Sequence, residues 1–134
     1  MARLFFLLSG EHETLPTAEL KVILEAEGYP YKVLERLDQV LRVEADPKCV
    51  EAVKNRAALT RLCALELFTC EAEPSVAVKA LRSTSQSEVL KSGESFAVRI
   101  KHVKTHASEV DGMTLERKLG AVILESVKLS LIHI

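Results

Sequence analysis

Hydrophobic residues near the start of the chain change from strand-like to helical spacing. The largely apolar run at 3–8 predicts a buried strand, because it is short and is followed by a turn-forming Ser-Gly pair. Leu20, Ile23 and Leu24 then lie at positions i, i+3 and i+4, which places them on one face of a helix. Gly28 suits the left-handed residue that follows a helix, so we expect the helix to end just before it.

Two short β-like runs and a helix start follow. Residues 31–36 and 40–44 are joined by Asp38-Gln39, and this spacing predicts a hairpin. Asp46-Pro47 predicts the start of a second helix, with Asp as its N-cap and Pro at the first helical position.

The first half closes with a predicted strand at residues 62–68. Cys63, Leu65 and Leu67 would share one face of it, because side chains alternate along a strand. The resulting order β-α-β-β-α-β predicts an α+β, ferredoxin-like domain over residues 1–72.

The second half begins at Pro74, where apolar residues at helical spacing predict a helix that a Ser/Thr-rich run then breaks. Residues 96–101 alternate between apolar and polar positions, which predicts a strand. Phe96, Val98 and Ile100 would face inward on this strand, and the residues between them would face outward.

A last helix is predicted to start near Thr114. Its apolar stripe consists of Leu115, Leu119, Val122 and Ile123. Gly120 lies inside this helix, where glycine costs about 1 kcal/mol relative to alanine, so we expect it to permit a close packing contact.

Composition and cysteine usage limit the class of protein. The 134 residues are 48% hydrophobic and 28% charged, which is enough to bury a core. The longest apolar run, residues 4–8, is far shorter than the roughly 20 residues of a membrane-spanning helix. Cys49, Cys63 and Cys70 are an odd number without zinc-site spacing, so we interpret them as buried, reduced residues of a cytoplasmic protein.

Motifs of common catalytic and cofactor sites are absent from the sequence. The five glycines are at least eight residues apart, which excludes a phosphate loop and a GxGxxG fingerprint. Neither GxSxG nor HExxH occurs, and the four histidines do not form a metal-binding cluster. We therefore predict no catalytic, cofactor-binding or metal-binding residue in this chain.

Charge is distributed unevenly along the chain. Residues 1–74 carry nine basic and 13 acidic residues, whereas residues 75–134 carry nine basic and six acidic ones. Such asymmetry is typical of a chain in which one half meets a polyanion. The residues predicted to contact phosphates are Arg99, Lys101, His102, Lys104, Arg117 and Lys118. The alternative is a solvated face whose charges are balanced by Glu109, Asp111 or Glu116.

Two parts of the sequence resemble a known family. Residues 8–21 are similar to the N-terminus of archaeal tRNA guanine-10 N2-methyltransferases, and residues 96–101 with 115–123 resemble the core of their THUMP domain. The resemblance implies a ferredoxin-like domain at 1–72 and an incomplete THUMP domain at 73–128, in an RNA-binding fragment that lacks the catalytic domain.

The resemblance also implies what the parent enzyme would do. It would transfer methyl groups from S-adenosylmethionine to the exocyclic amine of a tRNA guanine, with tRNA as partner and without a membrane or a metal. Residues 129–134 depart from the family and resemble a translated sequencing-library adapter, so we expect them to be a tail without evolved function.

Two other functions are compatible with these patterns. THUMP modules also accompany enzymes of tRNA thiolation and deamination. A ferredoxin-like fold with an acidic first half could equally be a non-enzymatic interaction domain, because a fold does not fix a function. Aromatic residues are only 4% and the phenylalanines are predicted to lie in the core, which disfavours RNA binding by base stacking.

Overall fold

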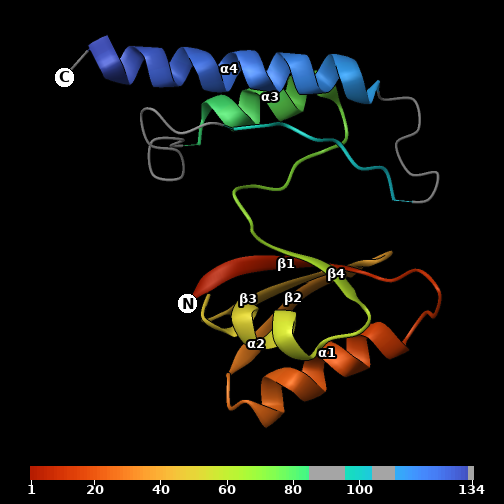
Figure 1. The fold of residues 1–134 in the computed structure, drawn as a ribbon. Coiled ribbons are helices and arrows are strands. Elements are labelled where there is room, and N and C mark those ends of the chain that lie inside the picture. The colour runs from red at the N-terminus through yellow and green to blue at the C-terminus, as the bar shows by residue number, and fades with distance from the viewer. Residues whose placement is uncertain (85–95, 104–110, 133–134) are drawn as a thin grey trace. The chain divides into compact units, whose positions relative to one another are not determined.

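The computed structural model of the chain describes residues 1–84, 96–103 and 111–132, with side chains described as far as Glu125. The chain divides into two compact units, Met1–Leu67 and Phe68–Ile134. Figure 1 shows a sheet with its helices in the first unit and a pair of helices in the second. Within the described ranges, no helix is long and apolar enough to cross a membrane.

The first unit has the predicted element order β-α-β-β-α-β. Its elements are β1 (Ala2–Leu8), α1 (Leu15–Ala26), β2 (Tyr31–Leu37), β3 (Val40–Ala45), α2 (Cys49–Arg56) and β4 (Thr60–Leu65). The strands lie in the order β2-β3-β1-β4, and all neighbouring pairs are antiparallel. Both helices cover the same face of the sheet (Figure 1). The α+β prediction is confirmed for this unit, and the topology is consistent with a ferredoxin-like fold.

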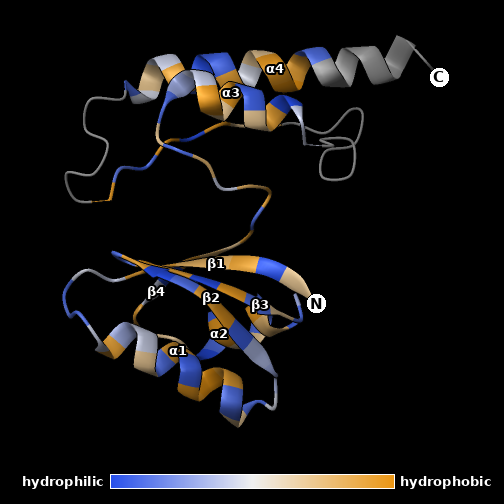
Figure 2. Cartoon of the chain, turned by 180° about the vertical axis from the view of Figure 1, so that it is seen from behind, coloured by the Kyte–Doolittle hydropathy of each residue, from blue (hydrophilic) through white to orange (hydrophobic). Residues whose placement is uncertain are grey.

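The core of the first unit lies between this face of the sheet and the two helices. Alternate residues of β1 and β3 point into it, and α1 and α2 each contribute one stripe, as the hydropathy colours of Figure 2 illustrate. The buried residues are Leu4, Phe6, Leu8, Leu20, Ile23, Leu24, Leu41, Val43, Ala45, Cys49 and Val53. The predicted helical face of α1 is therefore confirmed. Each large side chain buried here contributes about 1.5–3 kcal/mol.

The ends of α1 follow the local signals in the sequence. Thr14 is the N-cap residue, and Pro16 lies in the first turn, where its missing N–H removes no helical hydrogen bond. His12 supplies the cap instead of the threonine side chain, because its Nδ1 accepts the backbone N–H groups of Thr14 at 3.3 Å and Leu15 at 3.1 Å. Gly28 has a positive φ of 77°, as the prediction of a left-handed stop requires.

The second helix, α2, begins at Cys49, two residues later than Asp46-Pro47 predicts. Asp46 Oδ1 accepts the N–H of Lys48 at 2.9 Å, and the carbonyl of Asp46 accepts the N–H of Cys49 at 2.9 Å. These hydrogen bonds close a tight turn before the helix, so Asp46 organises the start of α2 without being its N-cap residue.

The last strand of the first unit, β4, spans Thr60–Leu65 and not the predicted residues 62–68. Its pairing with β1 ends at Leu4↔Leu65, because β1 continues for only two more residues. Cys63 packs against the core, but Leu65 is 55% exposed and Leu67 is 40% exposed. Leu67 lies beyond the end of β4, so the shared strand face that we predicted extends only over Cys63 and Leu65, and Leu65 is not covered on this edge strand.

The second unit contains α3 (Pro74–Arg82) and α4 (Gly112–Ile132), which pack against each other. Leu81 of α3 and Leu115 and Val122 of α4 are buried, as the predicted stripes require. α3 ends at Arg82, where the Ser/Thr-rich run begins, and this confirms its predicted end. Both views of the chain show the two helices side by side (Figures 1 and 2).

The predicted strand at 96–101 does not form. Within the ranges that the structure describes, the second unit has no strand, and Phe96 is 39% exposed instead of buried. The alternation survives at Val98 and Ile100, which are half-buried between exposed neighbours. A strand needs a neighbouring strand to accept its hydrogen bonds, and this segment lies against a helix. The prediction of a THUMP sheet is thus without a counterpart in the described residues.

The C-terminal part of the chain continues α4. The helix extends through residues 129–132, which belong to the predicted tail, while residues 133–134 lie outside the described range. Gly120 does not make the predicted close contact, because a Cβ built on it would lie 4.0 Å from Val98 Cγ2, an ordinary van der Waals distance.

Candidate nucleic-acid interface

Five of the six predicted phosphate-contacting residues lie in the described part of the second unit. Arg99, Lys101 and His102 belong to the segment 96–103, and Arg117 and Lys118 belong to α4; all five are exposed. Lys104, the sixth, lies outside the described residues. The structure therefore places these basic residues on two elements that contact each other.

Residues 98–102, which we call the basic segment, lie along α4 and run in the opposite direction to it. Val98 lies near Gly120, as described above, and Ile100 lies near Gly112, where a built Cβ would be 3.5 Å from Ile100 Cβ. The backbone N–H of Ile100 donates a hydrogen bond of 2.8 Å to Glu116 Oε1. The apolar residues of the segment thus face the helix, and its exposed cations alternate with them.

The start of α4 is fixed by Asp111. Its Oδ1 accepts the N–H groups of Met113 at 3.1 Å and Thr114 at 3.5 Å, and its Oδ2 accepts the hydroxyl of Thr114 at 2.7 Å. The hydrogen bonds from Thr114 lower the pKa of the Asp111 carboxyl, and the positive charge of Arg117 adds to this effect. Asp111 therefore acts as an N-cap, a role that the sequence analysis did not assign.

Charge balance distinguishes the functional interpretation from the solvated-face alternative. Within the described residues, no ion pair of 4 Å or less involves Arg99, Lys101, Arg117 or Lys118. Of the predicted counter-charges, Glu109 lies outside the described ranges and Asp111 caps α4. Glu116 accepts the N–H of Ile100 instead of pairing with a cation. These four cations thus have no ion-pair partner among the described residues, although Arg117 is near enough to Asp111 to influence its pKa.

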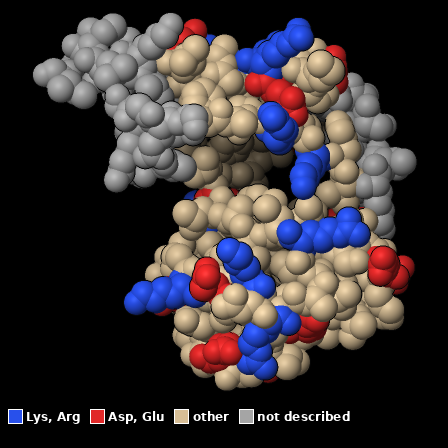
Figure 3. Space-filling model, viewed as in Figure 1, with Lys and Arg blue, Asp and Glu red and all other residues tan. Residues whose placement is uncertain are grey.

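The first unit uses its charges differently. Arg42 donates to Glu66 at 2.5 Å and 3.0 Å and to Glu35 at 2.7 Å, and Arg56 donates to Glu27 at 2.7 Å. Figure 3 shows basic and acidic side chains close to one another on the visible face of this unit. Its charged residues are thus partly neutralised by one another.

A pocket of about 330 Å³ lies beside the basic segment. Its floor is apolar, with Ala77 of α3, Ile100 and Leu115 of α4, and Lys101 and His102 contribute to its wall. Glu71 and Glu73 also line it. The sequence analysis did not associate these two acidic residues with the basic ones, because they precede them by about 30 positions. They place negative charge near one end of the basic segment.

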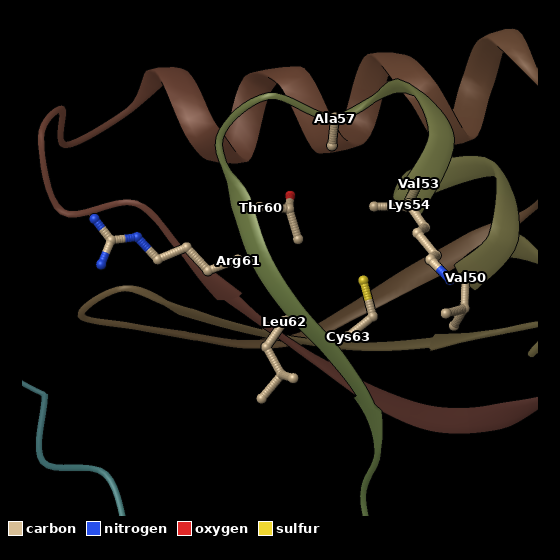
Figure 4. A pocket seen from close by; sticks show the side chains of 8 residues that line it. All are labelled: Val50, Val53, Lys54, Ala57, Thr60, Arg61, Leu62 and Cys63. Carbon is tan, nitrogen blue, oxygen red and sulfur yellow. The ribbon is translucent and has the colours of Figure 1, made fainter.

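A second pocket, of about 280 Å³, lies in the first unit between α2 and β4 (Figure 4). Val50, Val53 and Ala57 form an apolar wall on the helix side, and Cys63 points toward them. Thr60 Oγ1 is buried there without a hydrogen-bond partner. The side chain of Arg61 extends away from this gap in Figure 4, so the pocket does not hold a cluster of polar groups.

The three cysteines are free, but they differ in exposure. Cys49 is buried and Cys63 is half-buried, and burial raises the pKa of both thiols, so they stay protonated at neutral pH. Cys70 is exposed, which corrects the prediction that all three are buried. Among the residues described, no three His, Cys, Asp or Glu side chains form a group that could hold a metal ion.

Comparison with known proteins gives one relationship. No family model matches the chain. The chain is 32% identical over 123 residues to the tRNA (guanine(10)-N2)-dimethyltransferase of Methanothermobacter thermautotrophicus, and this match covers 92% of the chain and 34% of the relative. The chain thus spans about a third of the length of the relative that it matches. Its similarity is to a tRNA methyltransferase, as residues 8–21, 96–101 and 115–123 indicate from the sequence.

Proposed function

We propose that this chain is the tRNA-binding portion of a tRNA (guanine-N2)-methyltransferase, and that its second unit is a THUMP-like module. The similarity to a tRNA (guanine(10)-N2)-dimethyltransferase across 92% of the chain supports the substrate class. The observation that carries the binding role is the set of exposed cations on the basic segment and α4 that have no ion-pair partner among the described residues.

Phosphate contact is the mode of binding that suits these side chains. Lysine and arginine that neutralise phosphates release condensed counterions, so the affinity falls as salt rises. Arg99 and Lys101 are two residues apart on one side of the basic segment, and Arg117 and Lys118 lie on the helix that supports it. Phe6 is buried and Phe5 and Phe68 are half-buried, so base stacking on these three rings contributes little, whereas Phe96 is 39% exposed.

The proposal concerns RNA binding and does not place methyl transfer on residues of this chain. S-adenosylmethionine would be the methyl donor of the parent enzyme, but the residues present do not fit it. The closest glycines are eight positions apart, and neither described pocket combines a glycine-rich loop with a carboxylate for a ribose. The role that we propose for this chain is therefore to bind and orient the RNA.

The test is the binding of an unmodified tRNA transcript to the chain at several salt concentrations. Reversing two cations with Arg99→Glu plus Lys101→Glu should weaken binding at least about tenfold and reduce the salt slope by about 2, one unit for each lost phosphate contact. Lys48→Glu plus Lys54→Glu makes the same change of charge on the exposed surface of α2 and should have a much smaller effect.

Two outcomes would contradict the proposal. If the two double variants weaken binding equally, the interaction depends on net charge and not on the basic segment. If tRNA binds with no salt dependence, or does not bind, the RNA-binding role is wrong. The interaction-domain alternative would then be the better interpretation of the fold.

A further inference from the structure

Glu116 is an acidic residue that lies between the basic segment and the basic residues of α4. It lies on α4, immediately before Arg117 and Lys118, and its carboxylate reaches the basic segment. From charge alone, such a residue should repel a phosphate backbone, and its removal should strengthen RNA binding. The structure gives it a different role.

The basic segment is attached to α4 by few interactions. Among the described residues, the segment forms no strand, and the hydrogen bond from Ile100 N–H to Glu116 Oε1 at 2.8 Å is the polar contact that joins it to the helix. Val98 and Ile100 add apolar contact at either side of this bond, near Gly120 and Gly112. As far as the described residues show, Arg99 donates to the carbonyl of Val98, within the segment itself.

We infer that Glu116 is a positioning residue, which fixes the basic segment on α4 so that Arg99 and Lys101 project together as one phosphate-binding site. This inference rests on the proposed RNA-binding function. A charged acceptor forms a stronger hydrogen bond with a backbone N–H than a neutral one, and it does so here where the described residues provide no neighbouring strand. Without it, Ile100 N–H loses its partner, and the cations on either side of Ile100 lose their common orientation.

Three single substitutions separate the positioning role of the Glu116 side chain from the effect of its negative charge. Glu116→Gln removes the charge and keeps an oxygen acceptor, whereas Glu116→Ala removes both. Glu125→Ala removes the same charge from an exposed position on the same helix and serves as the matched control. Their affinities for the tRNA transcript, measured at one salt concentration, distinguish the two effects.

The inference predicts that Glu116→Ala binds tRNA roughly three- to tenfold more weakly than Glu116→Gln, which corresponds to the loss of one ordinary hydrogen bond. Glu116→Gln and Glu125→Ala should bind as tightly as the unmodified chain or more tightly, because each removes a negative charge. Equal affinities for Glu116→Ala and Glu116→Gln would overturn the inference, and so would an equal loss in Glu125→Ala.

Amide exchange at Ile100 provides a readout that does not depend on RNA. The N–H of Ile100 should exchange slowly in the unmodified chain and in Glu116→Gln, and faster in Glu116→Ala, while the amides of α4 keep their protection. Fast exchange in the unmodified chain would overturn the inference. If the unmodified chain fails to bind tRNA while Ile100 is protected, the proposed function fails and the attachment of the segment stands.

Discussion

The two units of this chain differ in the hydrogen bonds of their backbone and in the ion pairs of their charged side chains. In the first unit, four strands form one hydrogen-bonded sheet, and eleven buried residues form the core. Arg42 in this unit donates hydrogen bonds to two carboxylates. In the second unit, two helices bury Leu81, Leu115 and Val122, and an irregular basic segment lies on one of them. The first unit therefore has the features of a scaffold, whereas the second exposes charge on a small core.

The largest effect that would test this comparison is the loss of a core side chain. Phe6 is fully buried at the centre of the sheet, so Phe6→Ala should lower the free energy of unfolding of the first unit by about 3–5 kcal/mol. Leu115→Ala in the second unit, where the residue is 8% exposed, should cost about 2 kcal/mol. Residue-resolved amide exchange measures both. Equal loss of protection in the two units after either substitution would contradict their separate stability.

The next effect concerns the ion pair between Arg42 and Glu66 in the first unit. Glu66, whose side chain is 4% exposed, accepts two hydrogen bonds from Arg42, and these lower the pKa of its carboxyl. Arg42→Met leaves this nearly buried carboxylate without its two short hydrogen bonds, with Arg3 Nε still 3.9 Å from Oε2, and should cost about 1–3 kcal/mol at neutral pH.

The pH dependence of the same pair has a defined sign. Because the folded carboxyl has a pKa below its ordinary value of 4.5, its stabilisation is complete above that pH and is lost as the pH falls through the lowered value. Urea unfolding between pH 3 and 7 should show a steeper loss of stability in the unmodified chain than in Arg42→Met. Parallel curves would show that Arg42 does not stabilise the charged form of Glu66.

Local signals in the sequence were sufficient to predict the elements of the first unit and insufficient to predict those of the second. The hairpin turn at Asp38-Gln39 and the stop at Gly28 depend on neighbouring residues, and both are present, with positive φ at Gln39 and Gly28. Buried or half-buried residues alternate with more exposed ones at 98–101 as they do in β3. A strand forms only where a neighbouring strand accepts its hydrogen bonds. Periodicity predicts which side is buried, and it does not predict the partner.

Two of the contacts that the sequence did not predict join residues that are far apart in the chain. Glu116 accepts an N–H that lies 16 residues earlier, and Arg42 meets a carboxylate 24 residues later. No spacing rule connects such pairs, since the distance between them is set by how the elements pack. The exposed basic residues could be named from the sequence because exposure requires no partner.

Two glycines provide a smaller contrast between the units. Gly28 has a φ of 77°, which disfavours any residue with a Cβ, so Gly28→Ala should destabilise the first unit by about 1 kcal/mol. Gly120 lies inside α4 with room for a methyl group, so Gly120→Ala should stabilise the second unit by up to about 1 kcal/mol. Thermal unfolding followed by circular dichroism tests both signs. A destabilising Gly120→Ala would indicate that Gly120 does make the close packing contact that the sequence predicted.

The smallest effect concerns the first turn of α4. Asp111 is exposed, and the hydrogen bonds from Thr114 lower the pKa of its carboxyl below the ordinary 3.8. Its contribution is therefore complete above that pH and decreases as the pH falls through the lowered value. Asp111→Ala should increase the exchange of the amides at 113–115, while Asp111→Asn, which keeps an oxygen acceptor, should preserve most of their protection.

The same variant also tests how the basic segment is supported. Gly112 follows Asp111 and lies close to Ile100, since a Cβ built on it would be 3.5 Å from Ile100 Cβ. Fraying of the first turn therefore disturbs the helix backbone beside the segment while Glu116, one turn later, keeps its hydrogen bond. If Glu116 is sufficient, the amide of Ile100 stays protected in Asp111→Ala, and the affinity for tRNA changes less than in Glu116→Ala. If Ile100 loses protection in both variants, the whole first turn of α4, and not one carboxylate, orients Arg99 and Lys101.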